Sequence, residues 1–229
     1  MRFDLMRRIA ALLLLALASF AQAQEKPAWK PLFDGKTLEG WKAADLFKPG
    51  ETTVANGAIR LSQGKRGTNG AMTGVVSTRK DLPTKDYEFK YQARRVEGED
   101  FFATVTFPVK DSHCSFVTGG WGGQTIGLSS LDGMDASEND TNGSFPFESS
   151  KWYAFRVRVT AGRIQSWIDD KQVVNLDIHD RKVGIRLECF ACRPLGLATY
   201  RTTGEVRDLA IRTLTPAEIT ESNKRTEEK

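Results

Sequence analysis

The stretch Tyr87-Glu88-Phe89-Lys90-Tyr91-Gln92-Ala93-Arg94 decides the fold class of this chain. Apolar and polar residues alternate along it, as they do in a β-strand that buries one face and leaves the other in water. The same alternation recurs at residues 155–159, and turn residues at 161–162 and 169–171 then separate two further apolar runs. These segments predict an antiparallel meander of three strands.

Short strands of this kind continue almost to the end of the chain. We expect them at residues 58–62, 74–78, 101–107, 114–118, 125–129, 183–190, 196–200 and 206–214. No helical crossover separates them, which excludes a parallel α/β sheet. Many short strands joined by tight turns predict an all-β fold, a two-sheet antiparallel sandwich.

The two ends of the chain differ from this middle part. Residues 1–23 combine a basic start, an apolar run over 9–20 and the small-x-small sequence Ala21-Gln22-Ala23, which is the pattern of a cleavable secretory signal. The run is too short to span a bilayer, so we expect cleavage before Gln24 and no membrane association afterwards. We therefore expect a single domain over 24–214, a polar tail over 215–229 that forms a short helix or is disordered, and a secreted or periplasmic location.

Charge and motifs exclude several classes of function. The formal net charge is +4 for the whole chain, and loss of the signal, with its three arginines and Asp4, would bring it to about +2. No cluster of lysine and arginine remains that would bind a nucleic acid, so we expect no such partner. No Gly-x-Ser-x-Gly, Walker A or dinucleotide motif is present, which leaves acyl hydrolase and nucleotide-binding functions without support.

The chain has three cysteines, Cys114, Cys189 and Cys192. An oxidising compartment would favour a disulfide, and the C-x-x-C pair Cys189 and Cys192 is one candidate. Buried free thiols are the alternative, and the spacing does not choose between the possible pairings.

Two segments rich in glycine, carboxylates and amides, residues 119–123 and 131–143, interrupt the strand pattern and suggest a functional loop. Glycoside cleavage commonly uses two carboxyl groups about 5–9.5 Å apart. Glu138 and Asp140 would share one face of an extended segment, and Asp135 is a third catalytic candidate. The same loop could instead bind a hard cation such as calcium, with Asp132 and Asp135 among the oxygen ligands, or have only a structural role.

Candidate substrate-binding residues follow from the same pattern. Trp121 is flanked by glycines that leave it uncovered, so it could stack on a sugar ring, whereas we expect Trp29, Trp41, Trp152 and Trp167 in the core. Polar strand positions could line a binding face, and the alternatives for them are a solvated sheet surface or structural ion pairs. These candidates are Glu88, Gln92, Arg186, Glu188 and Arg201.

The sequence Leu32-Phe33-Asp34-Gly35-Lys36-Thr37-Leu38-Glu39-Gly40-Trp41 resembles the opening of the DUF1080 family, also called the 3-keto-disaccharide hydrolase domain. Later features agree in order: Trp152-Tyr153, the turn at 169–170, Val183-Gly184-Ile185 and the closing strand at 206–211. The resemblance implies a jelly roll similar to the concanavalin A-like lectins and glucanases. Family members usually carry a Gln-x-His-Gly-like element before the last strand, and the corresponding residues 194–201 contain no histidine.

These observations predict an exported, carbohydrate-active protein, and the resemblance implies glycoside hydrolase activity. The alternative is a lectin-like module that binds carbohydrate or a cell surface without catalysis, and a third possibility is a structural envelope protein. The fold by itself does not separate them, because jelly rolls serve both as lectins and as hydrolases.

Overall fold

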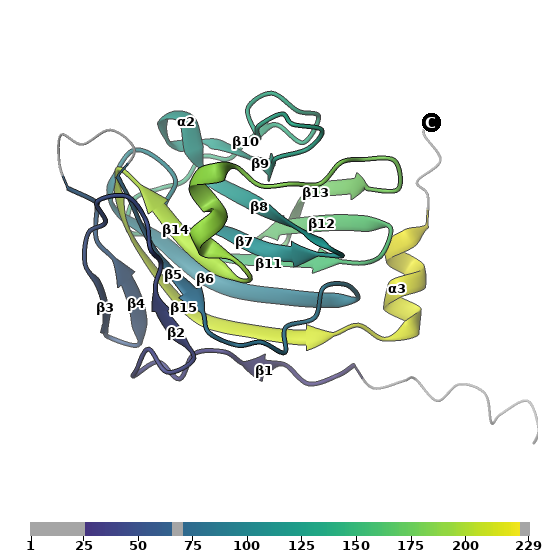
Figure 1. Cartoon of the computed structure of the whole chain (residues 1–229), viewed down its shortest axis with the longest axis horizontal. Coiled ribbons are helices and arrows are strands. Elements are labelled where there is room, and N and C mark those ends of the chain that lie inside the picture. Colours follow the sequence, from purple (N-terminus) through teal and green to yellow (C-terminus); the bar gives the residue numbers. More distant parts are fainter. Residues whose placement is uncertain (1–25, 66–70, 225–229) are drawn as a thin grey trace, which may run out of the picture.

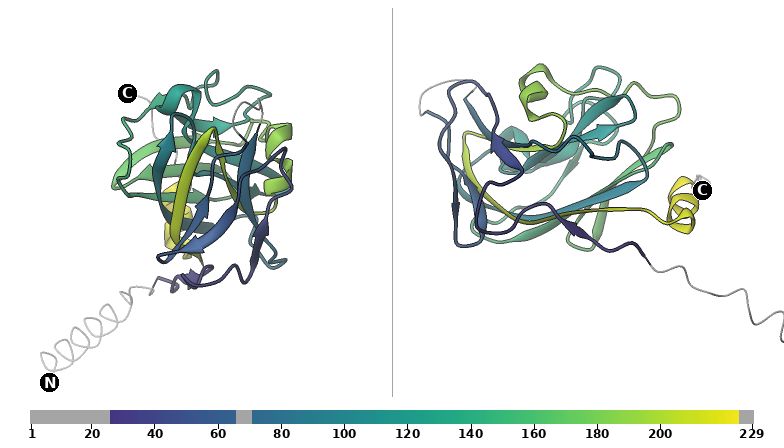
Figure 2. Two further views of the ribbon diagram at one scale, coloured as in Figure 1. Left: turned by 90° about the vertical axis from the view of Figure 1, so that its left-hand side faces the viewer. Right: turned by 60° about the horizontal axis from the view of Figure 1, so that its bottom comes forward.

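The computed structural model describes residues 26–65 and 71–224, so the expected signal at 1–23 lies outside the described residues. Two antiparallel sheets of eight and seven strands stack face to face (Figures 1 and 2). The predicted all-β, two-sheet sandwich is therefore confirmed. Among the described residues, no helix is long and apolar enough to cross a membrane.

The eight-stranded sheet has the order β13-β12-β11-β6-β15-β4-β3, with β1 beside β15. Its strands are β1 (Lys30–Pro31), β3 (Thr52–Ala55), β4 (Ala58–Leu61), β6 (Tyr87–Gly98), β11 (Tyr153–Val159), β12 (Arg163–Ile168), β13 (Lys171–Asp177) and β15 (Thr202–Thr213). Strands β11, β12 and β13 are neighbours in the sheet and form the predicted meander.

The seven-stranded sheet has the order β10-β9-β8-β7-β14-β5-β2. Its strands are β2 (Trp41–Ala43), β5 (Met72–Ser77), β7 (Thr104–Val109), β8 (Ser112–Gly119), β9 (Thr125–Ser129), β10 (Gly143–Ser144) and β14 (Gly196–Tyr200). Three short helical segments complete the described chain: α2 (Gly120–Gly123), η1 (Leu187–Cys192), which is a 3₁₀-helix, and α3 (Pro216–Asn223).

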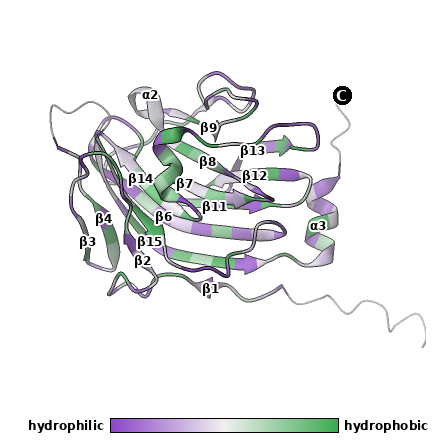
Figure 3. Ribbon diagram, viewed as in Figure 1, coloured by the Kyte–Doolittle hydropathy of each residue, from purple (hydrophilic) through white to green (hydrophobic). Residues whose placement is uncertain are grey.

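The core forms where the alternating strands of one sheet face those of the other. Tyr87, Phe89 and Tyr91 of β6 are at most 1% exposed, and Tyr91 stacks on Phe155 of β11 with ring centroids 5.0 Å apart. The alternation of apolar and polar residues along β6 and β15 is visible in Figure 3. Burial of these large side chains is the main source of stability in such a sandwich.

On the outer side of the same sheet, Glu88 is only 1% exposed. Its carboxylate accepts hydrogen bonds of 2.7 Å from Arg156 and from Arg158, and it also binds Arg212. Burial by itself would raise the pKa of Glu88, but the three arginines together lower it below its ordinary value. Glu88 is therefore an internal anchor of the sheet and not the exposed substrate ligand that the sequence suggested.

Three of the tryptophans expected in the core, Trp29, Trp152 and Trp167, lie instead on this outer side, under lysine or arginine side chains. The guanidinium carbon of Arg156 lies 3.7 Å from the ring centroid of Trp167, and that of Arg207 lies 4.0 Å from the centroid of Trp152. Cation–π contacts of this kind cover the rings without placing them between the sheets. Trp41 is in the core as expected, and its indole N–H donates to the carbonyl of Leu32 at 2.7 Å.

The segment predicted as a strand at 183–190 is not one. Val183 forms only an isolated bridge with Leu131, and the chain then enters η1. Cys189 and Cys192 lie three residues apart and pack together in a small apolar cluster with Met72 and other residues, whereas Leu187 is 76% exposed. The two buried residues, Cys189 and Cys192, are three positions apart, which is the period of a 3₁₀-helix. Over so few residues this spacing is easily mistaken for the alternation of a β-strand.

The polar tail forms the short helix α3, one of the two expected states. A capping box between Thr215 and Glu218 starts the helix, and Glu218 also binds Arg212 at 2.7 Å. That contact with Arg212 is the main reason why the pKa of Glu218 falls to about 2. Polar contacts of this kind attach α3 to one end of the sandwich (Figure 1), since its sequence has no apolar stripe.

The contribution of the buried Glu88 cluster to stability can be tested by mutation. Replacing Glu88 by glutamine should lower the free energy of unfolding by about 3 kcal/mol, because three guanidinium groups would lose their buried counter-charge. The difference from the wild type should disappear as the pH falls through the folded-state pKa of Glu88, since a lowered carboxyl pKa stabilises only above that range.

Urea unfolding at several pH values measures this effect. Glu148→Gln is the matched control, because its ion pair with Lys151 is exposed to solvent and should contribute little to stability. A loss at Glu88→Gln no larger than at this control would show that the buried cluster does not stabilise the fold.

Candidate functional site

The outer face of the seven-stranded sheet differs from that of the other sheet in its side chains. Along β8, Cys114 and Phe116 point into the core, whereas His113, Ser115 and Val117 point outward. Two outward positions of β7, 104 and 106, carry threonine, and the hydroxyl groups of Thr106 and Ser115 lie 2.8 Å apart. Small side chains on these central strands leave space above the sheet.

The helix η1 crosses this space and contacts β5 and β14 (Figure 1). It divides the face into two hollows, with Cys189 at one side and Phe190 at the other. The smaller hollow, which we call the Trp121 pocket, has a volume of about 270 Å³. It is lined by Met72, Asp100, Phe101, Thr104, Ser115, Val117, Trp121, Ser129, Arg186, Glu188, Cys189 and Tyr200.

Trp121 reaches this pocket from the turn α2, between β8 and β9. Gly119, Trp121, Gly122 and Gly123 all have positive φ angles, between 45° and 101°. At Gly123 a β-carbon would lie 2.8 Å from the carbonyl oxygen of Glu99, so this position requires glycine. The tight turn leaves Trp121 47% exposed, available to stack on a sugar ring.

Asp100 lies at the base of the turn and was not among the residues expected from the sequence. Its carboxylate accepts a hydrogen bond of 2.8 Å from the backbone N–H of Phe101, and the N–H of Gly122 also donates to it. Burial raises the pKa of Asp100 above its ordinary value and outweighs these hydrogen bonds and the charges of Arg201 and Arg95. Asp100 is therefore a carboxyl group that holds its proton more readily than usual, which suits a general acid.

Arg186 and Glu188 also line the pocket, at the start of η1. The guanidinium of Arg186 donates 2.9 Å and 3.3 Å hydrogen bonds to Glu188 and also binds Asp135. The hydrogen bond from Arg186 is the main cause that lowers the pKa of Glu188, so this second carboxyl group stays ionised. The pocket thus pairs a carboxyl group of raised pKa with one of lowered pKa.

The acidic loop itself is held together by internal contacts. Arg181 donates to Asp132 at 2.6 Å and to Asp140 at 2.7 Å and 3.0 Å. The amide of Asn139, only 5% exposed, donates to the carbonyl oxygens of Leu128 and other residues. The loop is therefore a well-bonded surface structure beside the pocket.

The three carboxyl groups expected to be catalytic are separated by these contacts. Asp140 is bound to Arg181, and the exposed Glu138 accepts a long 3.4 Å hydrogen bond from the backbone N–H of Asp135. Neither lines the Trp121 pocket. Asp135 lies directly behind the pocket, where it binds Arg186 and accepts a 3.2 Å hydrogen bond from Ser129.

The residues expected to bind calcium and the cysteines expected to form a disulfide make other contacts. Within the described part of the chain, no group of three or more histidine, cysteine, aspartate or glutamate residues is placed to hold a metal ion. Asp132 and Asp135, the expected calcium ligands, bind arginines instead. Cys189 and Cys192 are free buried thiols and not a disulfide, and burial raises the pKa of Cys192 to about 12.

The other expected ligands have different positions. Gln92 lies on the outer side of the eight-stranded sheet and accepts hydrogen bonds of 2.9 Å and 3.0 Å from Arg207. Arg201 lies in the turn between β14 and β15, outside the pocket, where its charge acts on Asp100. Only Trp121, Arg186 and Glu188 are brought together as substrate-binding candidates.

The structure adds Asp100, Phe101 and Tyr200 to this group. The rings of Phe101 and Tyr200 stack with centroids 5.8 Å apart, and both line the pocket beside Trp121. Phe101 falls in a predicted strand and Tyr200 at the end of another, so their pattern indicated only that they belong to the sheet. The one available signal was the order of residues 99–102, Glu-Asp-Phe-Phe, which places a carboxylate directly before an aromatic pair.

A comparison with protein families identifies the domain. The model of the 3-keto-alpha-glucoside-1,2-lyase-like domain matches residues 28–212, which is most of the chain and all of both sheets apart from the last residue of β15. The chain belongs to this family. No protein among those with curated descriptions matches the sequence.

Members of other carbohydrate-active groups share the fold of this lyase-like domain. The Crh5 transglycosylase in complex with NAG is 12% identical, with a TM-score of 0.55 over 84% of this chain and 89% of its own. Domain 4 of an extracellular arabinanase from Geobacillus stearothermophilus, solved with arabinotriose, is 12% identical, with a TM-score of 0.52 over 87% and 98%. A glycosyl hydrolase family protein from Mycobacterium fortuitum is 8% identical, with a TM-score of 0.51 over 82% and 100%. These similarities establish a sandwich fold found in glycosyl hydrolase and carbohydrate-binding domains.

The role of Arg181 can be tested directly. Replacing Arg181 by glutamine should speed backbone hydrogen exchange in residues 131–142 by about tenfold or more, because two carboxylates lose their shared partner. Exchange in the core strand β6 should not change. Unchanged exchange in the loop would show that the ion pairs of Arg181 do not hold it.

Proposed function

We propose that this chain is an exported enzyme that cleaves the glycosidic bond of a 3-keto-glycoside in the Trp121 pocket. The observation that carries the proposal is the pair of carboxyl groups in that pocket, Asp100 with a raised pKa and Glu188 with a lowered one. The family match supports the substrate class, since its description names a 3-keto-alpha-glucoside.

Asp100 would act as the general acid. A protonated carboxyl group can give its proton to the glycosidic oxygen as the bond from that oxygen to C1 breaks. The hydrogen bonds from Phe101 and Gly122 hold the carboxyl group in place at the wall of the pocket.

Glu188 and Arg186 would act on the other side of the sugar ring. A ketone at C3 makes the hydrogen on C2 acidic, and an ionised carboxylate can remove that proton while the electron pair forms the C1–C2 double bond. The guanidinium of Arg186 would stabilise the negative charge that develops on the C3 oxygen. The products are an unsaturated keto sugar and the released alcohol, and Asp100 supplies the proton that the alcohol gains.

Binding would depend on the aromatic side chains. Trp121 can cover the apolar face of a sugar ring, and the stacked rings of Phe101 and Tyr200 close the adjacent side. The hydroxyl groups of Ser115 and Ser129 and the side chain of Thr104 lie at the floor, where sugar hydroxyls need partners.

A non-catalytic carbohydrate-binding domain is the second candidate. The observation that favours it is the ion pair between Arg186 and Glu188, which occupies both oxygens of the carboxylate. In that case the same pocket would hold a sugar through Trp121 without cleaving it.

Kinetics on a panel of 3-keto-glycosides and the corresponding unmodified glycosides tests the proposal. The wild-type protein should cleave the keto substrates, and Asp100→Asn and Glu188→Gln should each lower kcat/KM by about 100-fold. The rate should also fall as the pH rises through the pKa of Asp100, because only the protonated form donates, and Asp100→Asn should abolish that dependence.

Trp121→Ala separates binding from chemistry. It should raise KM by about tenfold with a smaller effect on kcat, because it removes contact area and no reacting group. Asp170→Asn, an exposed change in the turn before β13, should leave both values unchanged. Binding of sugars by the wild type without any cleavage, at an affinity that Asp100→Asn does not change, would favour the second candidate.

A further inference from the structure

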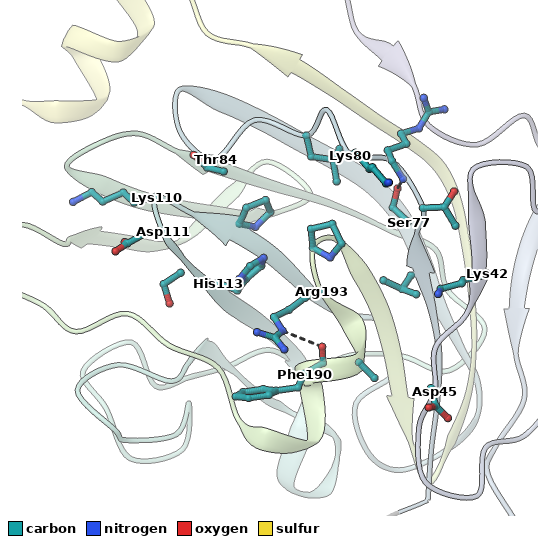
Figure 4. Close-up of a pocket in the computed structure, with 18 of the residues that line it drawn as sticks. Lys42, Asp45, Ser77, Lys80, Thr84, Lys110, Asp111, His113, Phe190 and Arg193 are labelled. Carbon is teal, nitrogen blue, oxygen red and sulfur yellow. Dashed lines mark hydrogen bonds between the residues drawn. The ribbon is translucent and has the colours of Figure 1, made fainter.

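A second hollow lies on the same outer face, on the other side of η1 (Figure 4). It has a volume of about 910 Å³ and runs between the ends of β2, β5, β7 and β8. Phe190 of η1 lines it, while the neighbouring Glu188 and Cys189 line the Trp121 pocket. The two hollows are therefore neighbours, and a ligand longer than a single sugar could occupy both.

This hollow, which we call the basic groove, has an excess of positive charge. Its lining includes five cations and two carboxylates: Lys42, Arg79, Lys80, Lys110 and Arg193 against Asp45 and Asp111. Within residues 26–65 and 71–224, none of these five cations has a carboxylate within ion-pair distance. The excess is local, because the formal net charge of the whole chain is only +4.

The outward arginines of the eight-stranded sheet show the contrast. They have carboxylate partners: Arg60, Arg94, Arg156, Arg158, Arg207 and Arg212. On that sheet the charges are neutralised within the protein. In the basic groove they are not, and several cations around one hollow create a positive potential that attracts an anion.

Arg193 is already oriented for such a contact. Its Nε donates a 3.1 Å hydrogen bond to the carbonyl oxygen of Phe190, and its guanidinium carbon lies 4.3 Å from the centroid of the Phe190 ring. These contacts hold the planar group against η1 (Figure 4). The two terminal nitrogens stay available to bind an anionic group in a bidentate manner.

His113 adds a neutral donor in the middle of the groove. It is half-buried, and no hydrogen-bond partner is present for its ring among the described residues. Burial and the nearby charge of Arg193 lower the pKa of His113, so the ring is neutral at pH 7. A neutral imidazole can donate one N–H to an anion without adding to the repulsion among the cations.

We propose that the basic groove binds the anionic group of an acidic saccharide, a uronate carboxylate or a sulfate ester, whose adjoining sugar occupies the Trp121 pocket. The identity of the ligand as a saccharide rests on the proposed function. The preference for an anion rests on the groove alone, on Arg193, Lys80 and the ring of His113. The enzyme would then select charged over neutral forms of its substrate.

Binding to matched saccharides tests the selectivity, with titration calorimetry on the purified protein. The probes are an oligogalacturonide, its neutral methyl ester, and a sulfated oligosaccharide with its unsulfated form. The wild-type protein should bind at least one anionic probe about tenfold more tightly than its neutral counterpart. If the preference is seen with the oligogalacturonide pair, the group recognised is a carboxylate; if it is seen with the sulfated pair, the group is a sulfate.

The double variant Arg193→Gln with Lys80→Gln should bind the anionic and neutral probes with similar affinity. Lys171→Gln is the matched control, because it removes an exposed positive charge at the start of β13, on the other sheet. Melting temperature and affinity for the neutral probe should be unchanged in both proteins. Equal binding of anionic and neutral probes by the wild type, or the same loss in Lys171→Gln, would overturn the proposal.

A second measurement does not depend on the proposed function. The chain has two histidines, His113 and His179, so their ring NMR signals can be assigned with a His113→Gln variant. Titration with inorganic sulfate should shift the His113 signal in a saturable way and leave His179, which is bonded to Asp177, unchanged. If no saccharide binds but sulfate still shifts His113, the proposed function fails while the anion site stands. No shift, or equal shifts at both histidines, would overturn the anion site itself.

Discussion

The carboxylate of Glu88 lies buried in the middle of the eight-stranded sheet, and the elements around it are arranged so that its charge is neutralised. Strand β11 supplies Arg156 and Arg158, and β15 supplies Arg212. Arg212 also binds Glu218, so the position of α3 depends on the same cluster. A shift of β6 by one residue would turn Glu88 toward the aromatic core, which makes this ion cluster a strong determinant of strand register.

The two outer faces of the sandwich are used differently because their side chains differ in size. Long arginine side chains cover the outer face of the eight-stranded sheet and lie across Trp152 and Trp167. On the seven-stranded sheet, the outward positions near the centre carry small hydroxyl residues such as Thr106 and Ser115. The helix η1 lies above these small residues and divides the space there into the Trp121 pocket, which contains Asp100 and Glu188, and the basic groove.

Several residues that look equivalent in the sequence have opposite roles in the structure. Glu88 and Glu188 are both glutamates at polar strand-like positions, yet Glu88 is enclosed by arginines and Glu188 lines the pocket. Asp140 belongs to a conspicuous acidic loop but is bound to Arg181 at the surface. Asp100 carried no such signal, and its pKa is raised by burial, which outweighs the hydrogen bond that the backbone N–H of Gly122 donates to it from the turn α2.

Local pattern by itself determined the class of fold and most of the strands. Alternation in β6 and β11, the turns of the meander and the glycines around Trp121 act over a few residues, so their consequences can be predicted from the chain alone.

Only the tertiary structure decided the site. The Trp121 pocket joins Asp100, Trp121 and Glu188, which are separated by up to 88 positions, and η1 exists because Cys189 and Cys192 pack on a sheet formed elsewhere in the chain. Burial, ion pairing and pKa depend on these long-range contacts, and the order of residues along the chain does not specify them without the fold.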